Sequence, residues 1–133
     1  MKNKLIFSIL SILIVSVVSC KKGPGIGGKA TIKGKVYEYN YNNSFTSIKS
    51  EYYKGNQDVY IVYGEEDFYA DKIETHYDGT FEFKYLLPGK YTIYTYSSDT
   101  AIDFSREMVV KTSVEIVDRK EMVNAGILKI YDI

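Results

Sequence analysis

The sequence has few of the residues that catalysis or covalent cross-linking requires. Among its 133 residues are one cysteine, one histidine and no tryptophan. A single thiol cannot close a disulfide within the chain, so a domain of this length must be stabilised by its hydrophobic core. A lone histidine without a nucleophile and an oxyanion site does not make a catalytic centre. We therefore expect no enzymatic activity and no cofactor.

The chain also lacks an excess of either charge. Lysine and arginine total 17, and aspartate and glutamate also total 17. Domains that bind nucleic acid usually carry an excess of basic residues, which neutralise the phosphates. The balanced charge therefore argues against a nucleic-acid partner.

The N-terminal segment is typical of a signal peptide. Lys2 and Lys4 precede an uncharged apolar run from Leu5 to Val18. As a helix, this run would be about 21 Å long, which is short of a hydrocarbon core of about 30 Å. Positive flanking charge and a short apolar run together predict an exported protein.

The end of this run, Val17-Val18-Ser19-Cys20, resembles the lipobox of bacterial lipoproteins. The resemblance implies cleavage before Cys20 and attachment of lipid to its thiol, because the thiolate is the nucleophile that accepts the lipid. It places the protein in the bacterial cell envelope, tethered to a membrane. The alternatives are an ordinary signal peptide with an incidental cysteine, and an uncleaved anchor.

The residues after Cys20 bear on which membrane carries the protein. Lys21 and Lys22 follow Cys20, so no aspartate stands directly after the cysteine. In enterobacterial-type sorting, the absence of this aspartate favours the outer membrane over the inner one. Surface lipoproteins of Bacteroidetes often carry acidic residues here, and this chain has none. We therefore expect the periplasmic face of the outer membrane rather than the cell surface.

The chain divides into three parts by composition. Residues 1–19 form the predicted signal peptide, and residues 20–29 form the lipidated cysteine with a glycine-rich tether. Glycine in this density disfavours regular structure and predicts a flexible spacer. Residues 30–133 form the predicted folded domain.

The predicted domain reads as strands, because apolar and polar residues alternate with a period of two between turn residues. Asp78-Gly79 and Leu87-Pro88-Gly89 are the clearest turn signals. An all-β, antiparallel Greek-key sandwich of about seven strands follows. The predicted strands lie within 31–39, 58–63, 69–77, 81–83, 91–96, 107–118 and 126–131. The long segment Asn40–Gln57 is expected to be a loop with room for an extra edge hairpin.

One stretch of the chain resembles a known family. Asp78-Gly79-Thr80-Phe81-x-Phe83 followed by Leu86-Leu87-Pro88-Gly89-x-Tyr91-x-Ile93 is similar to the carboxypeptidase regulatory-like domain. That family shares the transthyretin (prealbumin)-like sandwich, so the resemblance implies this fold across most of the predicted domain. It implies no activity, since each of these residues has a structural role in a turn or in the core.

The candidate catalytic and metal-binding residues each have a simpler explanation. His76 fits a partly exposed strand histidine better than a general base. The hydroxyisourate hydrolases, which also use the transthyretin-like fold, need more than one histidine and a Tyr-Arg-Gly-Ser-like ending that this chain lacks. The acidic residues Glu65-Glu66-Asp67, Asp99 and Asp103 lack the spacing of a calcium loop, so we expect solvated turns and no metal.

The sequence is rich in tyrosine, with 14 copies, and tyrosine side chains can contact ligands. Exposed tyrosines form interfaces with proteins and stacking surfaces for sugars, whereas paired tyrosines simply stabilise sheets. The main hypothesis is a non-catalytic, lipid-anchored sandwich with a structural or protein-interaction role in the envelope. The alternative is a glycan- or small-ligand-binding lipoprotein that uses a tyrosine face and the 40–57 loop, with Tyr52, Tyr53 and Tyr60 as the candidate ligand residues. The tyrosines that could line one face are Tyr37, Tyr39, Tyr41, Tyr52, Tyr53, Tyr60, Tyr94 and Tyr96.

Overall fold

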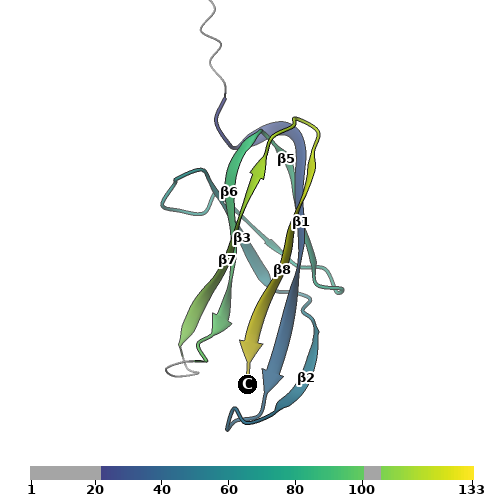
Figure 1. Cartoon of the computed structure of the whole chain (residues 1–133), viewed down its shortest axis with the longest axis vertical. Helices are drawn as coiled ribbons and strands as arrows, with labels where there is room; N and C mark the ends of the chain where they lie inside the picture. The colour runs from purple at the N-terminus through teal and green to yellow at the C-terminus, as the bar shows by residue number, and fades with distance from the viewer. Residues whose placement is uncertain (1–21, 101–105) are drawn as a thin grey trace, which may run out of the picture.

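The computed structural model describes residues 22–100 and 106–133, which form a two-layered β-sandwich (Figure 1). The all-β sandwich expected from the sequence is confirmed. The predicted signal peptide and Cys20 lie outside the described residues, within which no helix is long and apolar enough to cross a membrane. The strands are β1 (Ile26–Tyr41), β2 (Ile48–Tyr53), β3 (Asp58–Tyr63), β4 (Asp71–Glu74), β5 (Thr80–Leu86), β6 (Gly89–Ser98), β7 (Glu107–Ile116) and β8 (Met122–Asp132).

The strands divide into two sheets of four. Sheet A contains β1, β2, β5 and β8, and sheet B has the order β4-β3-β6-β7. Within sheet A, β1 pairs with β5 along its first half and with β2 along its second half, both antiparallel. Strand β8 pairs with the other edge of β1 in parallel. All strand pairs in both sheets are therefore antiparallel, as expected, except β1–β8. Strand β8 follows β7 of sheet B in the chain, so no hairpin joins it to β1.

The core lies between the sheets and is built from the inward positions of the alternating strands. Ile32 and Val36 of β1 are fully buried, and the intervening Gly34 leaves room for the ring of Phe81. The residues of the family-like stretch expected to face the core are buried: Phe81, Phe83, Leu86, Tyr91 and Ile93. The buried apolar residues are Ala30, Ile32, Val36, Val59, Ile61, Phe81, Phe83, Leu86, Tyr91, Ile93, Ile116, Leu128 and Ile130.

The tether is shorter than the sequence predicts, because β1 begins at Ile26 instead of after residue 29. Gly28 lies so close to the carbonyl of Leu86 that no side chain would fit there, so this glycine serves strand packing and not flexibility. Just before the strand, the Gly25 carbonyl accepts a 2.8 Å hydrogen bond from the Leu87 amide. The Tyr91 hydroxyl donates to the Leu87 carbonyl (2.6 Å) and accepts from the Gly25 amide (2.9 Å).

The segment Asn40–Gln57 contains β2, so the extra edge hairpin that it could hold is present. All six residues of β2 are exposed, and no apolar alternation marks this strand in the sequence. The predicted strand over 69–77 is reduced to β4, because residues 64–70 form a loop after β3 and residues 76–79 form the next turn.

The predicted Asp78-Gly79 turn is confirmed. Gly79 has φ of 76°, a backbone conformation that glycine adopts without strain. The Asp78 carboxylate accepts a 3.1 Å hydrogen bond from the Thr80 amide. This hydrogen bond lowers the pKa of Asp78 below its usual value, since it favours the charged carboxylate.

Replacing Gly34 with alanine tests the packing of β1 on the core. The added methyl would meet the Phe81 ring and lie 2.9 Å from the Gly126 carbonyl oxygen. We expect Gly34→Ala to lower the free energy of unfolding by about 2 kcal/mol, as overpacked cores do. Urea denaturation measures this loss. Gly23→Ala is the control, because nothing lies within 4 Å of its added methyl; equal stability of the two variants would contradict the packing described.

Candidate functional site

The structure distributes the tyrosines over two outer faces instead of one. Tyr53 lies on the outer face of sheet A, where it is paired with Tyr37, and Tyr60 lies on the outer face of sheet B, where it is paired with Tyr94. Tyr52 points to the opposite side of β2 from Tyr53, as neighbours in a strand must. The three candidate ligand residues, Tyr52, Tyr53 and Tyr60, are therefore not brought together, and a single ligand face containing all of them is wrong.

The sheet A tyrosine face consists of Tyr37, Tyr39, Tyr41, Tyr53 and Tyr131. Its rings pack mainly against one another: Tyr39 stacks on Tyr131 at 5.7 Å, and Tyr37 meets Tyr53 edge to face at 5.0 Å. Burial is the larger cause and the nearby carboxylate of Glu51 the second cause of a raised pKa at Tyr37, so its hydroxyl stays neutral. This face is a cross-strand network that stabilises the distal half of sheet A.

The sheet B tyrosine face consists of Tyr60, Tyr69, Tyr94 and Tyr96. Tyr60 and Tyr94 stack with their planes 9° apart and their centroids 4.9 Å apart. Tyr69, which comes from the loop before β4, contacts Tyr60 edge to face and is 53% exposed, while Tyr96 is 37% exposed. Two of these four tyrosines are therefore exposed, whereas on the sheet A tyrosine face only Tyr53, at 42%, is exposed.

A polar pair borders the sheet B tyrosine face. Lys72 Nζ lies 3.0 Å from the Asp58 carboxylate, and both side chains are partly exposed. The Tyr60 hydroxyl lies 3.5 Å from the same carboxylate. Burial of the ring and the charge of Asp58 raise the pKa of Tyr60, so its hydroxyl remains a hydrogen-bond donor at neutral pH. Open aromatic rings beside donors and acceptors make this face the candidate binding site.

Tyr52 instead belongs to a polar cluster around the buried carboxylate of Glu38. Glu38 continues the inward alternation of β1 past Val36 and is only 2% exposed. Its carboxylate lies 2.6 Å from Lys54 Nζ and accepts a 2.5 Å hydrogen bond from the Tyr52 hydroxyl. Glu38 is not among the residues predicted from the sequence, although its place in the alternation of β1 could have shown that it faces inward.

The charges of this cluster influence one another. The hydrogen bond to Glu38 raises the pKa of Tyr52 and keeps its hydroxyl protonated. Burial acts to lower the pKa of Lys54, but the hydrogen bond and charge of Glu38 outweigh this effect, and the pKa is raised. The cluster thus contains one negative and one positive charge with a neutral donor, and its role is to fix β2 against β1.

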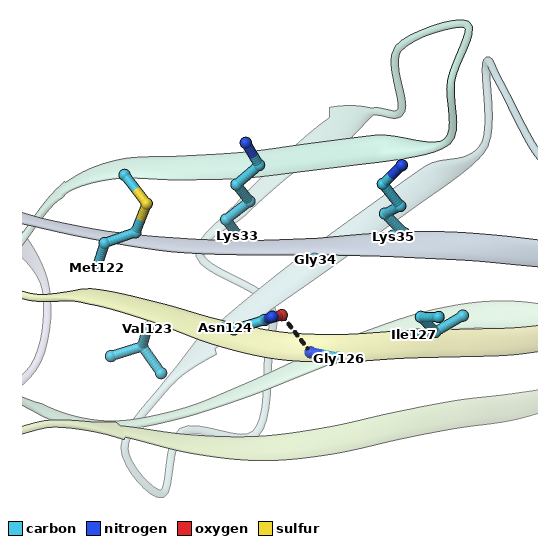
Figure 2. Close-up of a pocket in the computed structure, with 8 residues that line it drawn as sticks. All are labelled: Lys33, Gly34, Lys35, Met122, Val123, Asn124, Gly126 and Ile127. Carbon is cyan, nitrogen blue, oxygen red and sulfur yellow. Dashed lines mark hydrogen bonds between the residues drawn. The ribbon is translucent and has the colours of Figure 1, made fainter.

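A shallow hollow of about 350 Å³ lies over the β1–β8 pair (Figure 2). Figure 2 shows Lys33 and Lys35 of β1 projecting beside Met122 and Ile127 of β8, with two facing glycines between them. Lys33 already pairs with Glu82 at 3.4 Å, and Lys35 Nζ lies 4.3 Å from the centre of the Tyr53 ring. Because both cations have partners within the chain, the hollow is a weak candidate for an anion site.

The remaining candidate residues predicted from the sequence are not part of these faces. His76 is exposed in the turn after β4, and the Glu65-Glu66-Asp67 run is exposed in the loop after β3. Asp103 falls outside the described residues, whereas Asp99 lies just after β6. Over residues 22–100 and 106–133, no three or more His, Cys, Asp or Glu residues are grouped so that they could hold a metal ion.

Comparison with known proteins supports the fold. No family model and no curated protein matches the chain. Among solved structures, it is similar to the crystal structure of a protein from Pseudomonas aeruginosa described as a "putative carbohydrate binding protein". The two share 14% sequence identity and a TM-score of 0.50, over 77% of this chain and 90% of that one. At this identity, the similarity concerns the sandwich alone.

Substitution of Lys54 tests the polar cluster around Glu38. Lys54→Met leaves the Glu38 carboxylate buried without its cation, and we expect it to lower the free energy of unfolding by about 2–3 kcal/mol at pH 7, less than for a fully buried pair because Lys54 is partly exposed. Because the pKa of Lys54 is raised in the folded state, its charge stabilises the fold fully below the pKa of an unfolded lysine, about 10.4. This stability is lost as the pH rises through the folded pKa, so the difference in stability between Lys54→Met and wild type should shrink above about pH 10.4.

The double variant Glu38→Leu with Lys54→Met is the control for this test. It removes both charges, so most of the lost stability should return. Urea denaturation at pH 7 and at alkaline pH measures both effects. A double variant that is no more stable than Lys54→Met alone would show that the unpaired carboxylate is not the cause.

Proposed function

We propose that the chain is a non-catalytic lipoprotein of the bacterial cell envelope, attached to a membrane by lipid on Cys20. The observation that carries this proposal is the run from Leu5 to Cys20, in which a short apolar segment ends in a lipobox-like sequence. The arrangement of the sandwich is compatible with it, since only residues 21–25 separate Cys20 from β1. The periplasmic face of the outer membrane is the proposed location, and the carboxypeptidase regulatory-like domain is the proposed family of the sandwich.

The proposed role of the anchored sandwich is binding and not turnover. Tyrosines cover parts of both outer faces, while the described residues include a single histidine that stands exposed in a turn. Tyrosine contributes large contact area together with a hydroxyl that can hydrogen-bond, which is why protein interfaces favour it. An envelope protein held beside the membrane is therefore the first proposed partner.

Replacement of Cys20 tests the anchor. In cells supplied with an alkyne-tagged fatty acid, Cys20→Ala should lose the label and accumulate with residues 1–19 uncleaved, because both lipid transfer and the following cleavage need the thiol. Gel fluorescence and intact mass measure the two effects. Ser19→Ala is the control, since it keeps a small residue and should be labelled and cleaved normally. Normal cleavage of Cys20→Ala would point instead to an ordinary signal peptide.

A second candidate function is glycan binding at the sheet B tyrosine face. Two observations favour it: the open rings of Tyr69 and Tyr96 beside the Asp58–Lys72 pair, and the carbohydrate-binding description of the structural neighbour. Aromatic rings contact the apolar faces of sugars, while carboxylate and ammonium groups bind hydroxyls. This combination of apolar surface with a few placed polar groups is common in small-molecule sites.

Alanine substitution on this face tests the glycan proposal. A glycan array should give at least one specific signal, and Tyr69→Ala or Tyr96→Ala should weaken binding of that glycan by roughly tenfold, as removal of an aromatic contact does. Titration calorimetry gives the Kd. Tyr77→Ala is the matched control, because Tyr77 is 93% exposed in the turn between β4 and β5 and is not one of the tyrosines of this face. An array without signal, or equal weakening by Tyr77→Ala, would count against the proposal.

A further inference from the structure

Strand β7 has an open backbone edge in the described chain. On one side it pairs with β6 over all ten of its residues, with an unbroken register from Glu107 to Ile116. On its other side no strand pairs with it, and none of the hydrogen bonds between described residues outside the ladders involves its backbone. An unpaired row of amides and carbonyls is a template for another strand.

The other edges are less suited to pairing. Strands β2, β4 and β5 are shorter than β7, with six, four and seven residues against ten. The register of β8 is broken near Gly126, and at its far end the Tyr131 amide donates a 2.8 Å hydrogen bond to Ser97 Oγ. Short length, bulges and charged side chains are usual protections of sheet edges. Strand β7 is neither short nor bulged, and its charged residues Glu107, Lys111 and Glu115 are of both signs.

The side chains of β7 are also incompletely covered. Val110 and Val114 face the core but are only partly buried, and Val109 on the outer face is 48% exposed. Two partly buried residues of β8, Val123 and Ala125, pack on the same core. The apolar side chains between β7 and the neighbouring strand β8 of sheet A are therefore incompletely covered.

We propose that β7 pairs antiparallel with β7 of a second copy of this chain, with Ser113 opposite its own counterpart. Opposite residues then lie symmetrically about position 113. Lys111 faces Glu115 of the other copy, and by symmetry this ion pair forms twice. On the inner side, Val110 faces Ile116 and Thr112 faces Val114, so β-branched residues of both copies cover these apolar side chains.

Neighbouring registers are less complementary. A pairing centred on Lys111 would place Glu107 opposite Glu115, and like charges directly opposite each other are destabilising. A pairing centred on Thr112 would place Val109 opposite Glu115 and Lys111 opposite Ser113. The charges of β7 therefore select the register centred on Ser113.

This pairing joins the two copies of sheet B into one continuous sheet. The two sheet B tyrosine faces would then lie on the same surface. Because the copies run antiparallel, their N-terminal tethers leave from opposite ends of the dimer. Both tethers can reach one membrane when the joined sheet lies parallel to it, with sheet A, which contains β1, on the membrane side.

Disulfide cross-linking in membranes from cells that express the full chain tests this register. Ser113→Cys should give a reducible dimer under mild oxidation, because residues directly opposite each other have Cβ atoms about 5 Å apart. Wild type, in which Cys20 is the single cysteine, measures the background. Thr112→Cys is the control, because its own counterpart lies on a diagonal, about 7–8 Å away. Stronger cross-linking of Thr112→Cys, or a Ser113→Cys yield equal to background, would overturn the proposal.

Charge reversal in the Ser113→Cys background tests the ion pairs. Lys111→Glu should reduce the dimer yield about fivefold, since it places two glutamates opposite Glu115 residues. Adding Glu115→Lys should restore the yield, which also shows that the loss is not misfolding. Lys129→Glu, an exposed reversal on β8, should leave the yield unchanged. If the dimer yield does not recover in the double variant, the proposed pairing is overturned. The proposed function is tested separately by the lipid label and the glycan titration, and this result leaves both unchanged.

Discussion

Backbone hydrogen bonding along β1 is the interaction on which the rest of the sandwich depends. This strand has 16 residues, which at about 3.3 Å per residue span roughly 50 Å. It is the single strand of sheet A that pairs with all the others, β5 and β2 on one edge and β8 on the other. Without it, those three strands would have no partner within the sheet.

The side chains of β1 show how one strand serves several purposes. Its inward residues change from apolar at Ile32 and Val36 to charged at Glu38, where the strand passes beyond the hydrophobic core. There the packing of apolar side chains gives way to a polar cluster with Lys54 and Tyr52. Its outward residues change in the same region from lysines to the tyrosines that pair across sheet A.

Local patterns in the sequence predict the fold class and much of the core. The period-two alternation of β1 and β6 indicates which of their residues are buried, and the Asp78-Gly79 pair marks a turn that the structure contains. These features could be predicted because each depends on residues close together in the chain. The residues Phe81 and Tyr91 are buried for the same reason.

Features that depend on distant partners could not be predicted. The parallel β1–β8 pair joins residues about ninety positions apart, as with Lys35 and Ile127, and has no local signal. Strand β2 is exposed along its whole length and owes its conformation to pairing with β1. Gly28 appears flexible by composition, yet its missing side chain allows close contact with Leu86.

The candidate site shows the same division between local and distant information. Tyr52 and Tyr53 are neighbours in a strand, so the sequence alone requires that they face opposite ways. Whether Tyr60 shares a face with either depends on which sheet β3 joins, and that choice is made by its pairing with β6. The contact of Tyr69 with Tyr60 depends on the path of a loop.

The route by which the chain enters the sandwich also determines how it would carry mechanical load. Tension on a membrane tether would arrive at Gly25, where Tyr91 and Leu87 hold the backbone, and would then run along the axis of β1. Because ladder hydrogen bonds lie across that axis, those on both edges of β1 would be sheared together and not opened one after another. With the proposed lipid anchor, unfolding of the domain by such a pull would therefore have to break the hydrogen bonds of a whole sheet together.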